Sequence, residues 1–549
     1  ESRGLGDVYK RQEYDREELE RADAKLSPTA RETMYQQKFH LYRNLTKPSE
    51  RLYLSFAKAG ASGEAQNPSY LINEIRKLFP EIPVRDIEKE EKPEEKLEMP
   101  RSGEALFLEE LGRAAEGEID PLFEELYRWY AAHPEAGIPA ETYRKAAFLR
   151  CADGVIGKSA ASALYGDTLK NSATRLEKYA ACAFAHFMEF GLQIRERDQY
   201  ELKAADMGTV MHEALEKFSK KLQENGETWK TVTDDTRDRL IEECVEETMA
   251  DYGNTIFQSS SRNQYRMIRV KRILKRTVWA LQQQIRQGEF EPGEFEVSFS
   301  MEDSLSAINI DLSEHEKMRL RGRIDRVDLC ETDDKVYVKI IDYKTGNTSL
   351  DLVALYYGLQ LQLAVYLDAA VELEQKKHPG KQVEPAGVFY YHIDDPMLDQ
   401  EEDETDEAWG RRMLKALRMD GLVNADRKVV ELLDRVLEDG TTSDVIPVGK
   451  KKDGSYTSYS KVASPEQFDV IRTYTRKKVR EIGEGIFSGN VKISPYQRDG
   501  ATACAYCEYQ GICGFDQKIQ GYEYRKLKGM DTELLMKAMQ EITQSDQKE

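Results

Sequence analysis

One stretch of the chain, residues 322–346, constrains its fold more than any other. Two runs rich in Val, Ile and Leu alternate with polar side chains and flank the polar turn 331–334, which predicts a β-hairpin. Side chains two apart on a strand share a face, so Asp342 and Lys344 point the same way. The apolar content of both strands indicates that these charges lie beside a core.

The register of this hairpin decides which charged residue of the first strand lies beside Asp342 and Lys344. With the turn centred between Thr332 and Asp333, Asp325 lies opposite Ile340 and diagonal to Asp342, about 7–8 Å away at the backbone. Two carboxylates beside an ammonium can hold Mg²⁺ and orient a water, as phosphodiester hydrolysis requires. Asp-x-Lys by itself is more often a solvated charged pair, so the interpretation depends on the other motifs.

Composition sets the class of protein. At 549 residues the chain is too long for one core, and about two to four domains are expected. No apolar run approaches the ~20 residues of a membrane span, no export signal is visible, and the cysteine count is odd, so we expect a cytoplasmic protein without a disulfide framework. The net charge of −20 opposes nucleic-acid binding. Basic runs at 266–276 and 472–480 are either phosphate contacts or solvated helix faces.

Two helical patterns carry polar groups that suit a catalytic site. Residues 208–218 predict the start of an amphipathic helix with His212 at the edge of an apolar stripe formed by Met211, Leu215, Phe218 and Leu222. His212 is either a ligand for a divalent metal or a packed, satisfied histidine. Gln362 and Tyr366 are four residues apart and therefore share a helix face. They either position a phosphate or the lysine in the site, or form the polar edge of a packed helix.

Three cysteines close to the C-terminus predict a metal centre. Cys504, Cys507 and Cys513 follow the spacing C-x2-C-x5-C and gather three thiolates within ten residues. Three soft ligands imply a fourth, and four thiolates suit Zn²⁺ or an iron–sulfur cluster. Zinc sites usually consist of two short-spaced pairs, so a three-plus-one arrangement favours a [4Fe–4S] cluster.

Six motifs occur in an order that resembles a known family. They are Ser172–Cys182, Gly208–His212, Gly322–Asp328, Asp342–Lys344, Gln362–Tyr366 and Cys504–Cys513. Together they resemble the RecB-type nuclease domain of the PD-(D/E)XK superfamily, and the cysteines make the chain similar to the B subunits of AddAB-type helicase–nucleases. The resemblance covers about residues 172–516. It implies an α/β fold in which helices flank a mixed sheet.

The resemblance also implies roles for residues. His212, Asp325 and Asp342 would bind Mg²⁺ with the Tyr343 carbonyl, Lys344 would activate water, and Gln362 and Tyr366 would support the site. The cluster ligands would be Cys182, Cys504, Cys507 and Cys513. The chain departs from the family at Ala183, where a proline usually follows the first cysteine; no ligand is lost.

The N-terminal part resembles a different protein class. Residues 38–56 resemble the last motif of a superfamily 1 helicase core, with a strand-like segment at 52–56. Lys47 replaces the arginine that senses ATP, so we expect no ATP hydrolysis from this part. The predicted organisation is 1–80 the end of a helicase-like core (1–12 a cloning or assembly artefact), 81–102 a charged linker, 103–171 a helical connecting region, 172–520 the nuclease domain and 521–549 a helical tail.

The resulting functional hypothesis is a Mg²⁺-dependent exonuclease subunit. It would cut single-stranded DNA leaving a helicase during double-strand-break repair by homologous recombination, as the heterodimer partner of an AddA-type subunit and away from any membrane. Two alternatives stay open. One is a catalytically silent subunit that binds DNA or a partner, and the other is a free-standing Cas4-like exonuclease.

Overall fold

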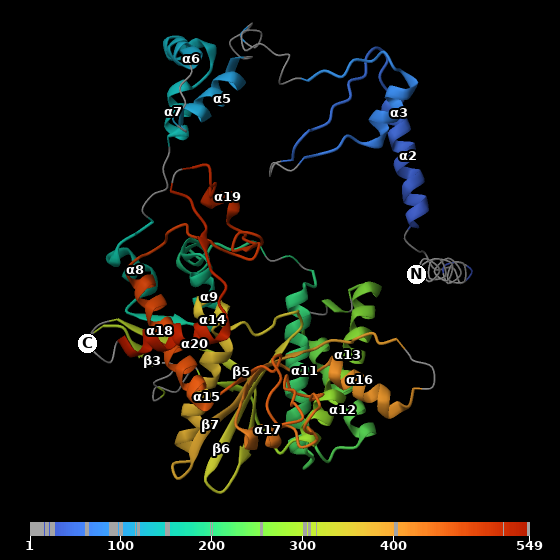
Figure 1. Ribbon diagram of the computed structural model, residues 1–549, viewed down its shortest axis with the longest axis vertical. Coiled ribbons are helices and arrows are strands. Elements are labelled where there is room, and N and C mark those ends of the chain that lie inside the picture. The colour runs from blue at the N-terminus through green and yellow to red at the C-terminus, as the bar shows by residue number, and fades with distance from the viewer. Residues whose placement is uncertain are drawn as a thin grey trace. The chain divides into compact units, whose positions relative to one another are not determined.

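The computed structural model describes most of the chain as two compact units. It covers residues 28–60, 65–86, 103–115, 121–148, 154–197, 201–252, 259–299, 309–313, 316–399, 404–519 and 521–545, with isolated positions 16, 21, 97, 117, 199, 256, 257 and 305. The units divide between Ala140 and Glu141. Residues 1–12 and most of the predicted linker 81–102 lie outside the described residues, and the predicted domain boundaries stay predictions (Figure 1).

The first unit is built from helices, among them α2 (Ala30–Thr46), α3 (Tyr70–Leu78), α5 (Gly103–Ala115) and α6 (Pro121–Ala132). Thr29 and Glu32 form a capping box that begins α2. The strand expected at 52–56 is wrong, because residues 51–57, which the structure describes, have no regular structure. An alternating pattern forms a strand only when a second strand pairs with it. The likeness of residues 38–56 to a helicase motif stays a prediction.

The second unit contains a mixed sheet, which confirms the predicted α/β class. Among the described residues the strand order is β2-β5-β6-β7-β8-β9. The strands are β2 (Glu291–Ser298), β5 (Arg323–Glu331), β6 (Lys335–Lys344), β7 (Gln382–His392), β8 (Asp420–Asn424) and β9 (Val462–Ala463). Strands β2, β5 and β6 pair antiparallel, whereas β6 and β7 pair parallel through a crossover that contains α14 (Leu352–Tyr356) and α15 (Gln362–Lys377).

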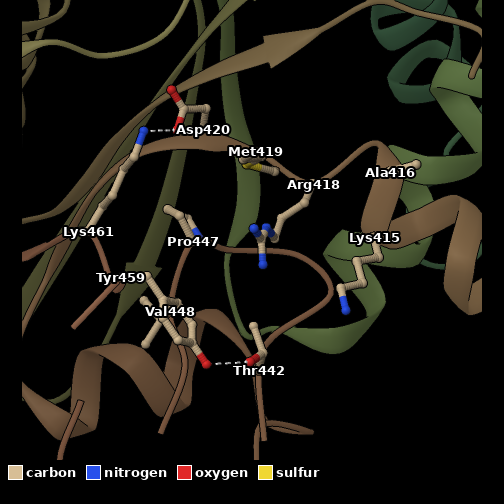
Figure 2. A pocket seen from close by; sticks show the side chains of 10 residues that line it. All are labelled: Lys415, Ala416, Arg418, Met419, Asp420, Thr442, Pro447, Val448, Tyr459 and Lys461. Atoms are coloured by element: carbon tan, nitrogen blue, oxygen red, sulfur yellow. Dashed lines mark hydrogen bonds and ion pairs between the residues drawn. The ribbon is translucent and has the colours of Figure 1, made fainter. Parts of the chain in front are cut away.

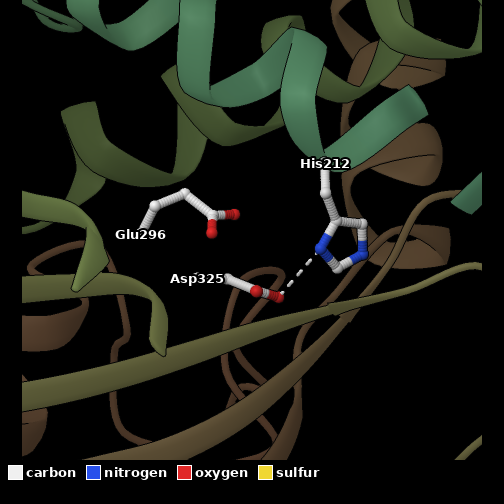
Figure 3. Close-up of side chains that lie close together, drawn as sticks. All are labelled: His212, Glu296 and Asp325. Carbon is white, nitrogen blue, oxygen red and sulfur yellow. Dashed lines mark ion pairs between the residues drawn. The ribbon is translucent and has the colours of Figure 1, made fainter. Parts of the chain in front are cut away.

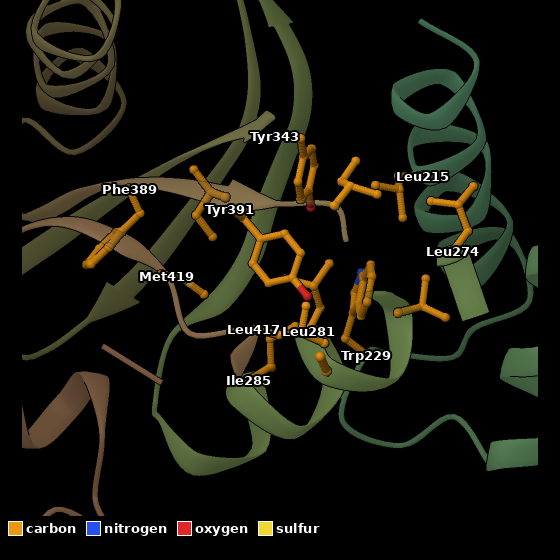
Figure 4. Close-up of a cluster of buried hydrophobic side chains, with 14 of the residues drawn as sticks. Leu215, Trp229, Leu274, Leu281, Ile285, Tyr343, Phe389, Tyr391, Leu417 and Met419 are labelled. Carbon is orange, nitrogen blue, oxygen red and sulfur yellow. The ribbon is translucent and has the colours of Figure 1, made fainter. Parts of the chain in front are cut away.

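Helices cover both faces of this sheet (Figure 1). One face packs against α11 (Ala204–Glu224), α12 (Asp234–Asp251) and α13 (Ser261–Gln287) in an apolar core that includes Leu215, Leu274, Leu281 and Tyr391 (Figure 4). The other face packs against α15, α18 (Pro465–Phe487) and α20 (Thr532–Ser545). Strand β6 lies between these cores, which explains why it is buried along almost its whole length.

Smaller elements complete the second unit. They are α7 (Ala140–Ala147), α8 (Lys158–Tyr165), β1 (Thr168–Asn171), α9 (Ala173–Ala181), α10 (Ala183–His186), η3 (Phe187–Gly191), β3 (Asn309–Asp311), β4 (Lys317–Leu320), α16 (Asp406–Ala416), α17 (Arg427–Leu433), β10 (Tyr496–Arg498), β11 (Ala501–Thr502), α19 (Gln510–Cys513) and β12 (Arg525–Lys526). The stretch that leads into the predicted hairpin therefore forms two separate strands, β4 and β5. At Gly322, between them, a Cβ would lie 2.2 Å from the Phe299 ring, so the backbone passes too close to that ring for any side chain.

The hairpin β5–β6 forms as predicted, but its register differs by two residues. The structure pairs Val327 with Ile340, and the same register sets Asp325 directly across from Asp342 instead of Ile340. The predicted turn centre was wrong because Thr332 belongs to the ladder. Its N–H donates to the Lys335 carbonyl at 2.8 Å, and its hydroxyl accepts the Lys335 N–H at 3.2 Å. A shift of two residues keeps every side chain on its predicted face.

Candidate active site and metal centre

Three neighbouring strands bring three carboxylates into one row. The registers of β2–β5 and β5–β6 place Glu296 across from Asp325, and Asp325 across from Asp342. Adjacent strands are only about 4.8 Å apart, so these acids repel one another unless a proton or cation lies between them. The row therefore forms an anionic centre where the hairpin meets β2.

Helix α11 adds His212 to this row. The helix begins at Ala204, four residues before the predicted start, because Asp206 accepts the Lys203 N–H at 2.7 Å and caps the first turn. Its predicted apolar stripe is buried. His212 Nδ1 lies 3.3 Å from Asp325 Oδ2 (Figure 3). The imidazole also packs edge-on against the Tyr343 ring.

The donor set of this centre fits a divalent cation. His212, Glu296 and Asp325 each offer one ligand atom, all within 4.8 Å of one another (Figure 3). Glu296 Oε2 and Asp342 Oδ2 are buried and take part in no hydrogen bond within the part of the chain that the structure describes, although Arg323 and Lys344 approach them at 2.9 Å and 2.6 Å. Carboxylate oxygens with one imidazole suit Mg²⁺ or Mn²⁺.

Sequence reasoning missed Glu296. The sequence pattern around it does not distinguish it from Glu294, which also lies on β2 but pairs with Lys377 at 2.6 Å. The structure separates the two, because Glu296 has a backbone φ of 51°, in the left-handed region that glutamate rarely adopts. Such strain persists mainly at functional positions, where the surrounding structure enforces it.

The protonation of the row reflects its excess of negative charge. Burial, followed by the Asp325 charge, raises the pKa of Asp342 to about 6, although Lys344 opposes the shift. Burial and Asp325 likewise raise the pKa of Glu296 to about 7. Burial acts to lower the pKa of His212, but the hydrogen bond and charge of Asp325, with the charges of Asp342 and Glu296, outweigh it and raise that pKa. A bound cation would relieve this repulsion.

Lys344 and Gln362 clamp Asp342 from both sides. Lys344 Nζ lies 2.6 Å from Asp342 Oδ2 and donates to Gln362 Oε1 at 3.0 Å. The Gln362 amide in turn donates to Asp342 Oδ1 at 2.7 Å and to the Tyr366 hydroxyl at 3.2 Å. The structure therefore brings the predicted pair Gln362 and Tyr366 to the Asp-x-Lys motif, through the first turn of α15.

A second residue without a predicted role, Glu177 of α9, holds that first turn. Its carboxylate accepts the N–H groups of Leu361 and Gln362 at 2.6 Å and 3.0 Å. Burial raises the pKa of Glu177, while these two hydrogen bonds and Lys344 oppose the rise. A carboxylate at a helix N-terminus satisfies free N–H groups and complements the helix dipole. Glu177 thereby positions Gln362.

Tyr343 lies between Asp342 and Lys344 along the chain, and its side chain belongs to the core on the opposite face of the sheet. Its ring packs edge-on against Tyr391, while its N–H donates to Asp325 Oδ2 at 2.7 Å. This bond orients the Asp325 carboxylate. The Tyr343 carbonyl as a metal ligand stays a prediction.

Comparison with known proteins identifies the fold that carries this centre. The model of the PD-(D/E)XK nuclease superfamily matches residues 170–514. The chain belongs to the PD-(D/E)XK nuclease superfamily. The match contains the acidic row, His212, the Lys344 clamp and the C-terminal cysteines.

Curated relatives of this PD-(D/E)XK protein share one name, that of the B subunit of an ATP-dependent helicase/deoxyribonuclease. The chain is 42% identical over 519 residues to that of Lachnoclostridium phytofermentans, a match covering 93% of this chain and 44% of the relative. It is 34% identical over 536 residues to that of Alkaliphilus metalliredigens, covering 97% and 46%. The chain thus spans less than half the length of these relatives.

The four predicted cluster cysteines of this PD-(D/E)XK domain lie in one neighbourhood. Burial raises the pKa of the Cys504 thiol, and interaction with Cys182, Cys507 and Cys513 raises it further. Cys182 ends α9 and is buried beside Cys507 and Tyr509.

Their spacing differs from that of a zinc site. Within the described ranges, no three cysteine sulfurs come within 4.8 Å of one another, whereas two thiolates on one zinc ion lie about 3.8 Å apart. Ligands to separate irons of a cluster do not need that proximity. Cys244 and Cys330 are buried in the other core, and Cys151 lies outside the described residues.

Among the helices that the structure describes, none is long and apolar enough to cross a membrane.

Proposed function

We propose that this chain is the nuclease-bearing part of the B subunit of a helicase–nuclease and hydrolyses DNA phosphodiester bonds with Mg²⁺. The observation that carries the proposal is the buried acidic row of Glu296, Asp325 and Asp342 beside His212 and Lys344, within a PD-(D/E)XK domain. The name of the relatives, which contains the word deoxyribonuclease, supports the same reaction.

Four side chains would hold the cation: His212, Asp325, Asp342 and Glu296, with the Tyr343 carbonyl completing the shell. When bound, Mg²⁺ polarises the phosphodiester and lowers the pKa of a water. Asp342, whose pKa is raised to about 6, would be ionised at neutral pH once the cation offsets the repulsion within the row. His212 would be neutral as a ligand, through Nδ1 or Nε2, because a protonated imidazole has no lone pair to donate.

Lys344 would orient the attacking water and offset charge on the phosphate. Its ammonium is already fixed between Asp342 Oδ2 and Gln362 Oε1, so one N–H direction is available for water or phosphate. Gln362 keeps Lys344 and Asp342 at a constant separation, and Tyr366 orients the Gln362 amide. Gln362 and Tyr366 would thus hold Lys344 and Asp342 in their reactive arrangement before substrate binds.

Cys182, Cys504, Cys507 and Cys513 would bind a [4Fe–4S] cluster that ties α9 to the C-terminal segment. The effect of the other three cysteines on the pKa of Cys504 supports this, as does Arg525, whose guanidinium interacts with Cys182 and would offset thiolate charge. Because α9 also carries Glu177, the cluster would stabilise the helix that fixes Gln362.

The substrate we propose is single-stranded DNA leaving a helicase during double-strand-break repair by homologous recombination, in the cytoplasm. The partner would be an AddA-type subunit in a heterodimer. Lys47 supports assigning ATP hydrolysis to the partner, since lysine cannot form the arginine fork to a γ-phosphate.

The test is cleavage of a labelled single strand by the purified 549-residue chain. We expect cleavage with Mg²⁺, none with excess EDTA, and recovery when Mg²⁺ is restored. A protein that binds the strand but leaves it intact under all three conditions would instead be a silent binding protein. Cleavage that continues in EDTA would refute the metal centre.

A further inference from the structure

A basic pocket lies beyond the sheet edge of the nuclease domain, apart from the acidic row. It has a volume of about 370 Å³ and is lined by residues from the last turn of α16 to the residue before β9 (Figure 2). Three cations contribute to its wall: Lys415, Arg418 and Lys461. No role in the proposed chemistry uses any of them.

The strand registers connect this pocket to the catalytic row. Asp342 pairs with Tyr390 across β6–β7, and Tyr390 pairs with Asp420 across β7–β8. Asp420, which lines the pocket, is thus two strand spacings, about 10 Å, from Asp342 along the same row. Its Oδ2 also accepts the Leu350 N–H at 2.9 Å, from the segment that follows Lys344. One nucleic-acid strand can therefore contact both places.

The charge of the pocket is opposite to that of the whole chain. Three cations face one lining carboxylate, Asp420, in a protein whose formal net charge is −20. Asp420 pairs with Lys461 (Figure 2). Arg418 donates to the Ser443 carbonyl at 3.2 Å, which fixes its guanidinium while other donors of the fork stay available.

A second carboxylate, Asp444, lies close by. Burial raises the pKa of Asp444, although Lys415, Arg411 and Arg418 oppose the rise. With Asp420 and Asp444 both counted, the three lining cations Lys415, Arg418 and Lys461 still outnumber the carboxylates.

An aromatic face is held in place at the pocket mouth. Tyr459 is 66% exposed, yet its hydroxyl lies 3.3 Å from that of Thr442 (Figure 2). A Cβ added to Gly449 would lie 3.1 Å from the Tyr459 ring, so the ring rests against this glycine. A fixed, exposed aromatic ring beside cations is the arrangement by which proteins bind single strands, with phosphate on the cations and a base stacked on the ring.

We propose that this pocket is a nucleotide subsite for single-stranded DNA. Arg418 and Lys415 bind a backbone phosphate, and Tyr459 stacks a base of the strand whose scissile phosphate lies at the acidic row. The inference rests on the proposed nuclease function. The cations of the pocket would attract the phosphates of DNA locally, although the negative net charge of the whole chain repels them.

The test measures binding without cleavage, using the full chain carrying Asp342→Asn, in EDTA, and a short fluorescent oligonucleotide. Arg418→Ala should lower the slope of log affinity against log salt by about 0.7, the value for one phosphate contact on a single strand. Tyr459→Ala should weaken binding about fivefold or more, and Tyr459→Phe should bind like the parent. Arg239→Ala, which removes an exposed cation from α12, is the matched control and should leave the salt slope unchanged.

An abasic strand separates stacking from a general structural effect. Tyr459→Ala should bind it as tightly as the parent does, because no base is present to stack. Equal losses on normal and abasic strands, or an Arg418→Ala slope equal to that of Arg239→Ala, would overturn the subsite. Neither result depends on cleavage. If wild-type protein fails to cut DNA while these binding effects appear, the proposed nuclease function is refuted, but the pocket is still a binding site for single-stranded DNA.

Discussion

The two faces of the β5–β6 hairpin carry charged clusters of opposite character. On one face, Asp328 binds the buried Arg326 at 2.5 Å and 2.8 Å and the buried Lys339 at 3.0 Å. On the other face, Asp342 has one cation, Lys344, and stands beside further acids. Cations therefore outnumber carboxylates around Asp328, whereas carboxylates outnumber cations around Asp342.

The pKa values follow this difference. Burial acts to raise the pKa of Asp328, but Arg326 and Lys339 outweigh it, so the pKa is lowered. Burial and Asp325 raise the pKa of Asp342 to about 6 instead. Alternation along two strands thus separates a satisfied ion cluster, which stabilises the fold, from an unsatisfied one, which can take up a cation. The predictions below test that separation.

The largest expected effect is on cleavage. Lys344→Ala or Asp342→Ala should reduce cleavage at least about a hundredfold, because each removes a group aimed at the reacting phosphate or its metal. Thermal unfolding of metal-free Asp342→Ala protein should change little, since this change removes one of the repelling acids. Lys344→Ala should melt earlier, because it leaves the buried Asp342 carboxylate without its cation. The measurement is single-strand cleavage beside a melting curve. Cleavage near the wild-type rate in either variant would contradict the assignment.

The opposite pattern is expected on the other face. Asp328→Ala should destabilise the protein by about 3–5 kcal/mol, because it leaves Arg326 and Lys339 as buried, unpaired cations. Denaturant unfolding gives the free energy directly. Protein that remains folded should keep its cleavage rate per folded molecule. A stable Asp328→Ala protein with lost cleavage would show that both faces serve the reaction.

The cysteine centre should affect both stability and metal content. Cys182→Ala should lose iron and the brown colour and melt earlier than the parent, because thiolate ligation contributes free energy only in the folded state. Cys244→Ala is the matched control, since Cys244 is also buried but belongs to the other core. Iron and sulfide analysis of anaerobically purified protein measures this. Full iron in Cys182→Ala, or one zinc and no iron in the wild type, would reject the proposed cluster.

Metal affinity should depend on pH through the raised carboxyls. Below pKa values of about 6 for Asp342 and about 7 for Glu296 the acids are protonated and cannot bind a cation. Mg²⁺ affinity should therefore fall as pH falls from about 7.5 to 5.5, and calorimetric titration can follow it. Glu296→Gln removes one of the two titrating groups and should flatten the upper part of this dependence. An unchanged profile would argue against Glu296 as a ligand.

The smallest expected effect is at Glu177. Glu177→Gln keeps an oxygen for the Leu361 and Gln362 N–H groups and should change kcat by less than about threefold. Glu177→Ala leaves them unsatisfied, a loss of about 1 kcal/mol for a helix cap, and should lower kcat several-fold with little change in KM. If Glu177→Ala lowers stability but leaves kcat unchanged, Glu177 only caps the helix and does not position Gln362 for the reaction.

Local patterns were enough for much of the site. Residues two apart on a strand share a face and residues four apart share a helix side, so Asp342 with Lys344, and Gln362 with Tyr366, follow from the sequence. The hairpin itself follows from alternation and a polar turn. Its register did not follow, because the Thr332 hydroxyl accepts the Lys335 N–H and the turn is centred one residue later than the pattern predicts.

The sequence by itself determined the hairpin, the faces of its charges and the family to which six ordered motifs belong. Only the tertiary structure decided that β2 lies beside β5, which brings Glu296 into the row, and that α9 reaches α15, which gives Glu177 its role. The strand order β6-β7-β8 likewise decided that Asp420, in the wall of the basic pocket, lies in register with Asp342 of the acidic row. Strand order and helix docking arise from burying whole apolar faces, a property of distant segments together that no local spacing encodes.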